Sequence, residues 1–371
     1  MKLLYVTANV LGDDGANAAE LFPRMAVLSS KISAVWVADY DKNKHRITQK
    51  QFAQFLRLRR QKEFGLYPAF RNALRIAKKS KDEGIDVVHI FYRQANNPLV
   101  SFLRIALIIL RCHTKILVDH RSVNLARGSR GFFKKISNQF MQIFAHQLAG
   151  NPLAVETNHF FIFKPKNIID LGYSQLPEGN AIELPDGRPI SVWFIGSMRP
   201  KNRKSEFLID VLDELEKRFS GDSRVVVRVA GPADQNQIHR LNQNSLVRYY
   251  GRLSRSDLYH LLRQNPGIGI AYMNEQFHWA APSLKFCEYA IMRFKIVASN
   301  TVGLQTQAKR LKFSDVIFAE ETVVGWADKL TDAIEDWSGI TPEWNNSHLW
   351  SYESIFSRQV LEIYRKLIAN A

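Results

Sequence analysis

Cysteine is scarce in this chain, with two residues, Cys112 and Cys287, among 371. Two cysteines build neither a disulfide framework nor a CxxC metal site, which fits a reducing compartment. Long hydrophobic runs are missing too. The longest, Leu99–Leu110, is interrupted by Arg104 and falls short of the ~20 apolar residues that span a bilayer. The opening residues, Met1–Val6, predict a first β-strand rather than a signal peptide. We therefore expect a cytoplasmic protein.

Several motifs of metal and phosphate chemistry are also absent. The ten histidines show no HExxH or comparable ligand spacing, so we expect no metal site. No GxxxxGK[ST] sequence is present, which excludes a Walker loop. An Asp-x-Asp pattern occurs at Asp39–Asp41, but it directly follows an expected strand and is interpreted as a turn.

Positive charge dominates the chain, whose formal net charge is +16, and it is unevenly distributed. Residues 1–180 hold 27 Lys or Arg and 13 Asp or Glu, whereas residues 181–371 hold 24 and 22. The first half therefore carries +14 and the second +2. Such asymmetry indicates a polyanionic partner for the first half, such as nucleic acid, an anionic membrane surface or a diphosphate-bearing substrate.

Two basic segments of the first half also contain aromatic residues. Residues 42–62 carry eight Lys or Arg, and Phe52, Phe55 and Leu56 among them have the spacing of a basic amphipathic helix. A solvated helix face packed by its phenylalanines is the simpler interpretation of that segment. The second segment, residues 127–135, places four Lys or Arg around Phe132 and Phe133, and makes a surface-binding role more credible.

Short apolar runs alternate with longer helical patterns along the whole chain. Strands alternating with helices predict parallel sheets with helices on both faces. The expected strands are Leu3–Val10, Ala34–Asp39, Asp86–Tyr92, Lys115–Asp119, Gln147–Gly150, Ile190–Gly196, Val225–Gly231, Val247–Gly251, Gly267–Tyr272, Lys295–Ser299 and Val316–Ala319. Helices are expected at Ser205–Arg218 and Arg255–Arg263.

The number of expected strands is too large for one ordinary sheet, so the sequence predicts two Rossmann-like domains. A second first-strand signature begins at Pro189, and the turn-rich residues 175–180 before it are interpreted as the linker. We expect one domain over 1–180 and another over 181–350. The apolar spacing of Tyr352–Leu367 predicts a helix, and we assign residues 351–371 to the first domain. Ligands of such sheets bind at the carboxyl ends of the strands.

Two segments of the second half carry candidate phosphate chemistry. The first, Gly196–Lys204, follows a strand and precedes a helix, so a flexible glycine, a helix N-terminus and basic side chains converge there. The second, Ala280–Ala290, begins with small residues and a proline, and its helix places Lys285 and Glu288 on one face. The simpler interpretations are a solvated basic loop and a surface Lys–Glu pair.

Three further segments accompany these two. Val229–Pro232 and Val247–Leu253 lie between them in the sequence, and Ile296–Ser299 follows. The series resembles the carboxy-terminal domain of GT-B glycosyltransferases, specifically family 4, the retaining nucleotide-sugar enzymes. The resemblance covers residues 190–305. It implies two Rossmann-like domains facing across a central cleft, with no tightly bound cofactor or catalytic metal and a UDP- or GDP-sugar as donor.

The resemblance also assigns donor-site residues one by one. Glu288 matches the second glutamate of the family's two-glutamate motif, which holds the nucleotide ribose, whereas the first is replaced by Ala280. Backbone around the donor sugar and diphosphate would come from Ala281 to Lys285, including Ser283 and Leu284. The Gly196 loop has Ser197 in place of the usual arginine. The remaining candidates for the diphosphate clamp are Lys201, Arg203 and Lys204.

The amino-terminal half resembles the family in outline. Gly12 and Gly15 occupy the positions where family members have a glycine-rich loop on the acceptor side. Arg121 is expected to be an acceptor-side residue as well. His120 follows the strand whose end lies near the transferred sugar, where it could contact the sugar or orient the acceptor. Asp119 is a candidate helper base or a capping residue.

The function implied is transfer of a sugar from a nucleotide-sugar to a membrane-proximal or lipid-linked acceptor, with retention, in cell-envelope polysaccharide or glycoconjugate synthesis. The enzyme would be peripheral on the inner face of the cytoplasmic membrane, with an anionic membrane surface as partner. Three alternatives stay open: a nucleotide-sugar 2-epimerase of the same fold, an inactive transferase, and a non-enzymatic protein that binds nucleic acid or another anionic surface. No nucleic-acid-binding module is present to favour nucleic acid.

Overall fold

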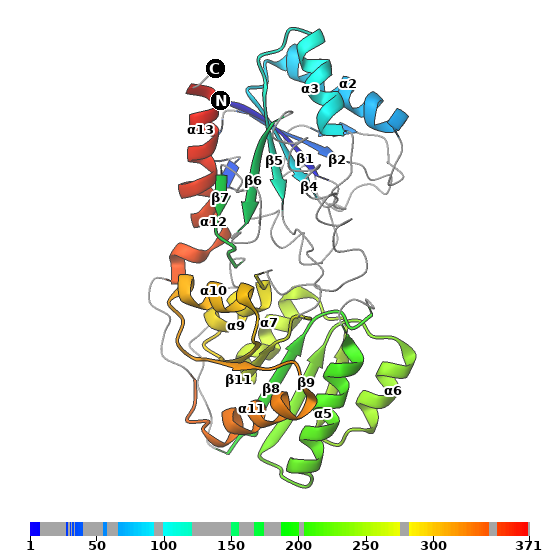
Figure 1. The fold of residues 1–371 in the computed structure, drawn as a ribbon, viewed down its shortest axis with the longest axis vertical. Helices are drawn as coiled ribbons and strands as arrows, with labels where there is room; N and C mark the ends of the chain where they lie inside the picture. The colour runs from blue at the N-terminus through cyan, green and yellow to red at the C-terminus, as the bar shows by residue number, and fades with distance from the viewer. Residues whose placement is uncertain are drawn as a thin grey trace. The chain divides into compact units, whose positions relative to one another are not determined.

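The computed structural model describes residues 1–7, 27–28, 30, 32, 34–39, 55–57, 66–92, 99–120, 150–155, 167–173, 187–199, 204–274, 282–340 and 347–369. These residues form two compact units (Figure 1). The first unit holds everything described up to Tyr173 together with the segment from Leu349 onward, and the second holds Gly187 to His348. The boundary expected near residue 180 lies outside the described residues.

The first unit is built on a seven-stranded parallel sheet. Its strand order is β3-β2-β1-β4-β5-β6-β7. The strands are β1 (Lys2–Thr7), β2 (Ala34–Asp39), β3 (Phe55–Arg57), β4 (Val87–Tyr92), β5 (Lys115–His120), β6 (Asn151–Val155) and β7 (Asn167–Ile169). β1 pairs with both β2 and β4, which is the order of a doubly wound fold with a switch point beside the first strand.

Two helices cover one face of this sheet. They are α2 (Leu66–Glu83) and α3 (Leu99–Ile109), which lie side by side (Figure 1). Along α2, small and branched residues recur at helical spacing, and Ala73 and Ile76 are completely buried against the sheet. Leu4 and Val6 of β1 point to the same face, because alternate residues of a strand share a side.

The carboxy-terminal segment also belongs to the first unit. It begins with α12 (Tyr352–Ile355), continues through a π-helical turn (Phe356–Val360) and ends with α13 (Leu361–Ala369). Within the π-helical turn, Gln359 forms two hydrogen bonds with Asp170, donating to Oδ2 over 2.6 Å and accepting from the backbone N–H over 2.9 Å. This reciprocal pair fixes the segment beside the residues that follow β7.

A buried polar cluster joins α13 to the sheet. His89 of β4 shares a hydrogen bond through Nδ1 with the Tyr364 hydroxyl, and its Nε2 lies 3.5 Å from Asp119 Oδ2 on β5. All three side chains are completely buried. Polar groups at such depth are costly unless they bond to one another, so the cluster specifies where α13 docks.

Removing the Tyr364 hydroxyl therefore should weaken the first unit. We expect Tyr364→Phe to lower the free energy of unfolding by about 1–3 kcal/mol, because His89 Nδ1 is left buried without this partner. Urea denaturation followed by circular dichroism measures the change. Tyr67→Phe is the matched control, since Tyr67 is 64% exposed. If Tyr364→Phe has the same free energy of unfolding as the wild type, the hydrogen bond makes no net contribution to stability.

The structure changes several sequence expectations in the first unit. Residues 55–57 were expected to be helical, but they form an edge strand. Their backbone pairs with Val37–Asp39 of β2. Of the strand expected at Gln147–Gly150, only Gly150 is described, and it lies outside a strand; β6 begins after it, at Asn151, and β7 was not expected at all. The rest of segment 42–62 and all of 127–135 lie outside the described residues.

The second unit contains a six-stranded parallel sheet of order β10-β9-β8-β11-β12-β13. Its strands are β8 (Ile190–Ile195), β9 (Val225–Ala230), β10 (Val247–Gly251), β11 (Gly267–Ala271), β12 (Lys295–Ser299) and β13 (Val316–Ala319), so all six expected strands are confirmed to within one residue. The helices are α5 (Ser205–Phe219), α6 (Gln235–Gln243), α7 (Arg255–Gln264), α9 (Leu284–Ile291), α10 (Val302–Leu311) and α11 (Val323–Glu335).

Different helices pack on the two faces of this sheet. Val192 and Val227 point toward α5 and α11, where Leu212 and Trp326 are buried with them. The opposite face receives α9, whose Tyr289 ring packs directly against Gly269 of β11. With both faces covered, the strands read as continuous apolar runs, which is why they were recognisable in the sequence.

None of the helices in the described part of the chain is long and apolar enough to cross a bilayer.

Candidate functional site

Glycines end three neighbouring strands of the second sheet at its carboxyl edge. Gly196 follows β8, Gly231 follows β9 and Gly251 ends β10, and all three have positive φ. Their backbones are linked in series: Gly196 N–H donates to Ala230 O over 2.8 Å, and Gly231 N–H donates to Gly251 O over 2.7 Å. Positive φ is accessible to glycine without a steric penalty, so these residues let the chain turn tightly where ligands of parallel sheets bind.

The closest approach in this edge is between Gly231 and Gly196. A Cβ on Gly231 would lie 2.1 Å from the Gly196 carbonyl oxygen, which is far inside van der Waals contact. The Tyr249 hydroxyl donates to Gly231 O over 2.8 Å and holds the turn from the other side. No side chain larger than hydrogen fits at position 231 without moving the loop that follows β8.

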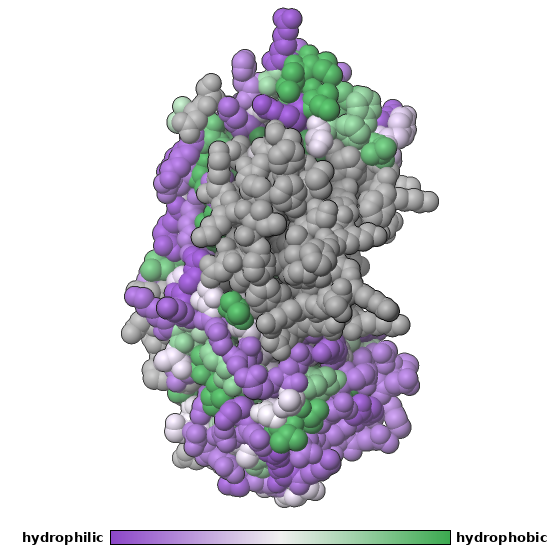
Figure 2. Space-filling model, viewed as in Figure 1, coloured by the Kyte–Doolittle hydropathy of each residue, from purple (hydrophilic) through white to green (hydrophobic). Residues whose placement is uncertain are grey.

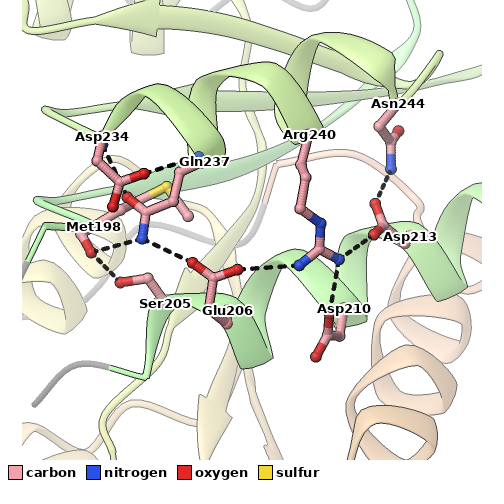
Figure 3. A network of polar contacts seen from close by, with 9 residues as sticks. All are labelled: Met198, Ser205, Glu206, Asp210, Asp213, Asp234, Gln237, Arg240 and Asn244. Atoms are coloured by element: carbon pink, nitrogen blue, oxygen red, sulfur yellow. Dashed lines mark hydrogen bonds and ion pairs between the residues drawn. The ribbon is translucent and has the colours of Figure 1, made fainter. Parts of the chain in front are cut away.

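The loop after β8 is also held in place by hydrogen bonds to the backbone of Met198. Its N–H donates to Pro232 O over 2.9 Å, and its carbonyl accepts from the Ser205 hydroxyl and, over 3.3 Å, from Gln237 Nε2. Figure 3 shows the two bonds to the Met198 carbonyl beside the start of α5 and α6. The turn from β8 into α5 is therefore held at both backbone groups of one residue.

An ion-pair network continues from that point and ties α6 to α5 (Figure 3). Arg240 contacts Glu206 at 3.1 Å, Asp210 at 2.7 Å and Asp213 at 2.5 Å. The hydrogen bond to Asp210 is the largest cause of a raised pKa for Arg240, and Asp213 adds to it. A guanidinium shared among three carboxylates keeps the two helices, and hence the loops at their amino ends, in one arrangement.

The amino end of α9 is held by a buried glutamine of α10. Gln307 accepts from Ser283 N–H over 2.8 Å and donates through Nε2 to Ser283 O over 2.9 Å. The Ser283 N–H is thus already bonded, so a bound phosphate at this helix would use other groups. Ser283 is the N-cap of α9 and forms no side-chain capping bond, and the helix macrodipole makes its start favourable for negative charge.

Tyr289 anchors α9 against β8. Its hydroxyl accepts from Ile195 N–H over 3.1 Å and donates to Trp193 O over 3.0 Å. Its ring occupies the space over Gly269, where a Cβ would lie 2.4 Å from the ring. Burial raises the pKa of Tyr289 well above its usual range, so the hydroxyl stays neutral and keeps both bonds.

Glu288 lies one residue earlier on α9 and meets the start of α7. The Tyr259 hydroxyl donates to Glu288 Oε1 over 2.9 Å, and the Arg255 guanidinium lies 3.9 Å from the same oxygen. The second oxygen, Oε2, has no hydrogen-bond partner among the described residues, and the side chain is 22% exposed. Burial raises the pKa of Glu288, while Arg255 acts in the opposite direction.

Two of the predicted cations have defined neighbours in this unit. The Lys285 ammonium lies 4.5 Å from the centre of the Phe194 ring, near the end of β8. Lys204, the N-cap of α5, has left-handed backbone geometry with φ of 45° and donates to Glu321 Oε1 over 3.1 Å. Of the residues predicted for the donor site, Gly196 and Lys285 thus converge on β8, and Lys204 reaches the loop after β13.

The remaining predicted residues have mixed outcomes. Asp119 is completely buried beside His89, so it has a structural partner, and its role as a base stays a prediction. His120 ends β5, and its side chain lies outside the described residues. The predicted residues Gly12, Gly15, Arg121, Lys201 and Arg203 also lie outside them. In the described part of the chain, no group of three or more His, Cys, Asp or Glu could hold a metal ion.

Sequence inspection did not identify three residues that define this edge. Tyr259 and Arg255 set the environment of Glu288, and Gln307 sets the start of α9. A tyrosine four residues after an arginine is a helical pair and was a visible signal for α7. Nothing in the sequence linked either of them to position 288, or position 307 to position 283, because those contacts are formed only by the fold.

Comparison with known proteins adds a fold-level result. No protein-family model matches the sequence, and no curated protein matches it. Among solved structures, a glycosyltransferase from Rickettsia africae ESF-5 is similar over 100% of this chain and 99% of its own, with a TM-score of 0.68 and 14% identity. HepE from Anabaena, solved with UDP and glucose, is similar over 100% and 99%, with a TM-score of 0.62 and 15% identity.

A third similar structure is a UDP-GlcNAc 2-epimerase from Methanocaldococcus jannaschii. It covers 99% of this chain and 100% of its own, with a TM-score of 0.57 and 11% identity. These similarities extend over both units, and the chain has the α/β fold of GT-B glycosyltransferases, as the sequence predicted.

The glycine contact at the strand edge yields a test. We expect Gly231→Ala to lower the free energy of unfolding by roughly 2–4 kcal/mol, because it adds a collision with Gly196 O to the strain of positive φ. Gly221→Ala is the matched control: Gly221 also has positive φ, of 79°, but a Cβ there meets no atom within 4 Å. Equal losses in the two variants, measured by urea denaturation, would show that the contact with Gly196 is unimportant.

Proposed function

We propose that this chain is a UDP-sugar-dependent glycosyltransferase whose second unit binds the donor at the carboxyl edge of its sheet. The observation that carries the proposal is Glu288. Its carboxylate accepts from Tyr259 at Oε1, its side chain is 22% exposed, and it lies on α9, whose N-cap Ser283 forms no side-chain capping bond, in the same unit as the three glycine-ended strands. The presence of UDP and glucose in the similar HepE structure supports uridine diphosphate as the nucleotide.

Each feature of the edge has a role in this proposal. A ribose carries two neighbouring hydroxyls, and a carboxylate accepts hydrogen bonds from both. Because Gly196 and Gly231 have no Cβ, a bulky ligand can approach their backbone closely. Lys285 and the first N–H groups of α9 supply positive potential for a diphosphate.

The chemistry follows from the leaving group. Breaking the bond between a sugar and a diphosphate places growing negative charge on the diphosphate oxygens. The helix start is held in place by Tyr289 and Gln307 before the donor arrives, so its N–H groups stabilise that charge without reorganising, and Lys285 on the same helix adds positive charge. Retention of configuration, as in family 4 enzymes, is part of the proposal and needs no enzyme nucleophile.

The acceptor side is proposed from charge. The first half of the chain carries +14 of the net +16, which suits an acceptor that is phosphorylated or linked to a lipid in an anionic membrane. Arg121 and the loop of Gly12 and Gly15 stay the proposed acceptor-side residues, and His120 and Asp119 stay the proposed catalytic residues. Polysaccharide or glycoconjugate synthesis at the cell envelope is the process that such an acceptor indicates.

Donor binding is tested by thermal shift. We expect UDP-glucose or another UDP-sugar to raise the melting temperature of the wild type, because a ligand that binds the folded state stabilises it. Glu288→Ala should abolish the shift, whereas Glu335→Ala, a change at an exposed position on α11, should retain it. No shift with any UDP-, GDP- or ADP-sugar would contradict the proposal.

Donor affinity should also depend on pH through Glu288. Burial raises the pKa of this carboxyl, and only the ionised form accepts both ribose hydrogen bonds. Affinity is therefore full above the raised pKa and falls as pH decreases through it. We expect titration calorimetry with a UDP-sugar to show affinity that weakens as the pH is lowered, beginning above the pH range in which an ordinary glutamate titrates.

A UDP-sugar is the appropriate probe in that titration, because its diphosphate carries no group that titrates near neutral pH, unlike free UDP. Glu288→Gln is the control variant. It keeps the shape but cannot ionise, so its weaker affinity should be independent of pH over the same range. A pH dependence that persists in Glu288→Gln would assign the titration to a different group.

A 2-epimerase is the second candidate, favoured by the similarity to the Methanocaldococcus enzyme. An epimerase uses no acceptor and returns an altered nucleotide-sugar, whereas a transferase releases UDP and forms a glycoside. Incubation with UDP-N-acetylglucosamine followed by chromatography distinguishes the two products. Epimerised UDP-sugar formed without any acceptor would replace the transferase proposal.

A further inference from the structure

The described surface of the first unit carries a concentration of exposed apolar side chains. Ten large hydrophobic residues of the described part of the chain are exposed, and seven of them lie on α2 and α3. The seven are Leu66 (64%), Tyr67 (64%), Phe70 (42%), Leu74 (37%), Ile105 (50%), Ile108 (61%) and Ile109 (68%). We call these seven residues the α2–α3 surface. Hydrophobic residues gather over these two helices at the top of Figure 2.

The seven residues form one surface because the two helices pack on the same side of the sheet. Leu103 and Ala73 bury the inner faces of α3 and α2 in one core. At the seam between the helices, the rings of Phe70 and Phe102 meet edge to face with centroids 5.7 Å apart. Their outer faces therefore point away from the sheet together. Apolar side chains gathered in this way mark a site of association.

Basic residues accompany this surface. The two helices carry six Lys or Arg and two acidic residues, and one acidic residue, Glu83, is paired with Lys79 at 2.5 Å. Arg75, Lys78 and Arg104 are exposed beside the apolar residues. Arg71 lies over the Tyr67 ring at 5.5 Å and donates to its hydroxyl over 3.1 Å, so an aromatic ring and a guanidinium are presented as one unit.

A shallow hollow of about 330 Å³ lies at the carboxyl ends of the same helices. Its lining includes three cations, Lys81, Arg111 and Lys115, and one acidic residue, Asp86. Asp86 accepts from the backbone N–H of Lys2 over 2.7 Å. Positive charge thus continues past Ile109 at the end of the α2–α3 surface.

We propose that the α2–α3 surface is the membrane-contacting face of this protein, and that its occupant is a bilayer rich in anionic lipid. Apolar side chains entering the headgroup boundary and cations at phosphate level are the two components of interfacial binding. Lys and Arg stems follow the apolar surface while their charges stay in water, which suits this intermixed arrangement. The biological role of this membrane contact rests on the proposed function, because an enzyme with a lipid-linked acceptor must reach the membrane.

Co-sedimentation with vesicles tests the proposal. The wild type should bind vesicles of equal phosphatidylcholine and phosphatidylglycerol, and bind phosphatidylcholine alone much more weakly. The double variant Ile108→Glu/Ile109→Glu should bind the mixed vesicles at least about tenfold more weakly, because two apolar anchors become charged. Both positions are more than half exposed, so the native fold tolerates the change.

The second unit provides the control. Val302→Glu/Val324→Glu changes two apolar residues that are 46% and 58% exposed there, and it should bind the vesicles like the wild type. Arg75→Ser/Lys78→Ser should weaken binding to the mixed vesicles at low salt and differ less from the wild type at high salt. The exposed pair Arg248→Ser/Lys309→Ser, in the second unit, should have no such effect.

The outcomes separate this proposal from the proposed function. A UDP-sugar thermal shift that persists in Ile108→Glu/Ile109→Glu, together with lost vesicle binding, supports the membrane face. Equal vesicle binding by wild type and this variant overturns it. Failure of the wild type to bind vesicles, with concentration-dependent self-association that the variant abolishes, also overturns it and assigns the surface to a second copy of the chain. Absence of the thermal shift alone contradicts the donor site and leaves the membrane result standing.

Discussion

The backbone of Gly231 lies directly against the carbonyl oxygen of Gly196, and the candidate site depends on that contact. It sets how closely the turns after β8 and β9 approach each other. Met198 is then held by Pro232 and Gln237, and α6 is bound to α5 through Arg240. An ion-pair network on one side of the unit thereby fixes the shape of a loop at the carboxyl edge.

On the other side of the same sheet, buried hydrogen bonds perform the corresponding task. Gln307 bonds to both backbone groups of Ser283, and Tyr289 bonds to two backbone groups of β8. These bonds position the start of α9 and leave Glu288 beside Tyr259. The Glu288 carboxylate is thus held by Tyr259 at Oε1 with its side chain 22% exposed, and burial raises its pKa.

The sequence predicted the second unit well because its strands are buried on both faces. β10, β12 and β13 match the expected residues without change, since a continuous apolar run between turn residues has few alternatives. The first unit was harder. β3 and β7 have three residues each and lie at the sheet edges, so neither has room for a recognisable pattern. The segment around Phe55 was expected to be helical from only three apolar positions.

The candidate site was predictable in part. Glu288, Lys285 and Gly196 were found because they lie in short segments with a recognisable order. Their partners were not, because Tyr259, Gln307 and Glu321 come from distant elements and contact the site only after folding. The sequence did not predict the α2–α3 surface for a different reason: Leu99–Leu110 was considered only as a membrane span, whereas a helix that lies against a membrane is marked by an apolar face next to basic residues.

A crystal structure of the chain with UDP bound tests the proposed donor site most directly. We expect the ribose hydroxyls within hydrogen-bond distance of the Glu288 carboxylate, with the diphosphate beside Lys285 and the start of α9. Electron density for UDP away from the carboxyl edge of the second sheet, with Glu288 still bonded only to Tyr259, would contradict it.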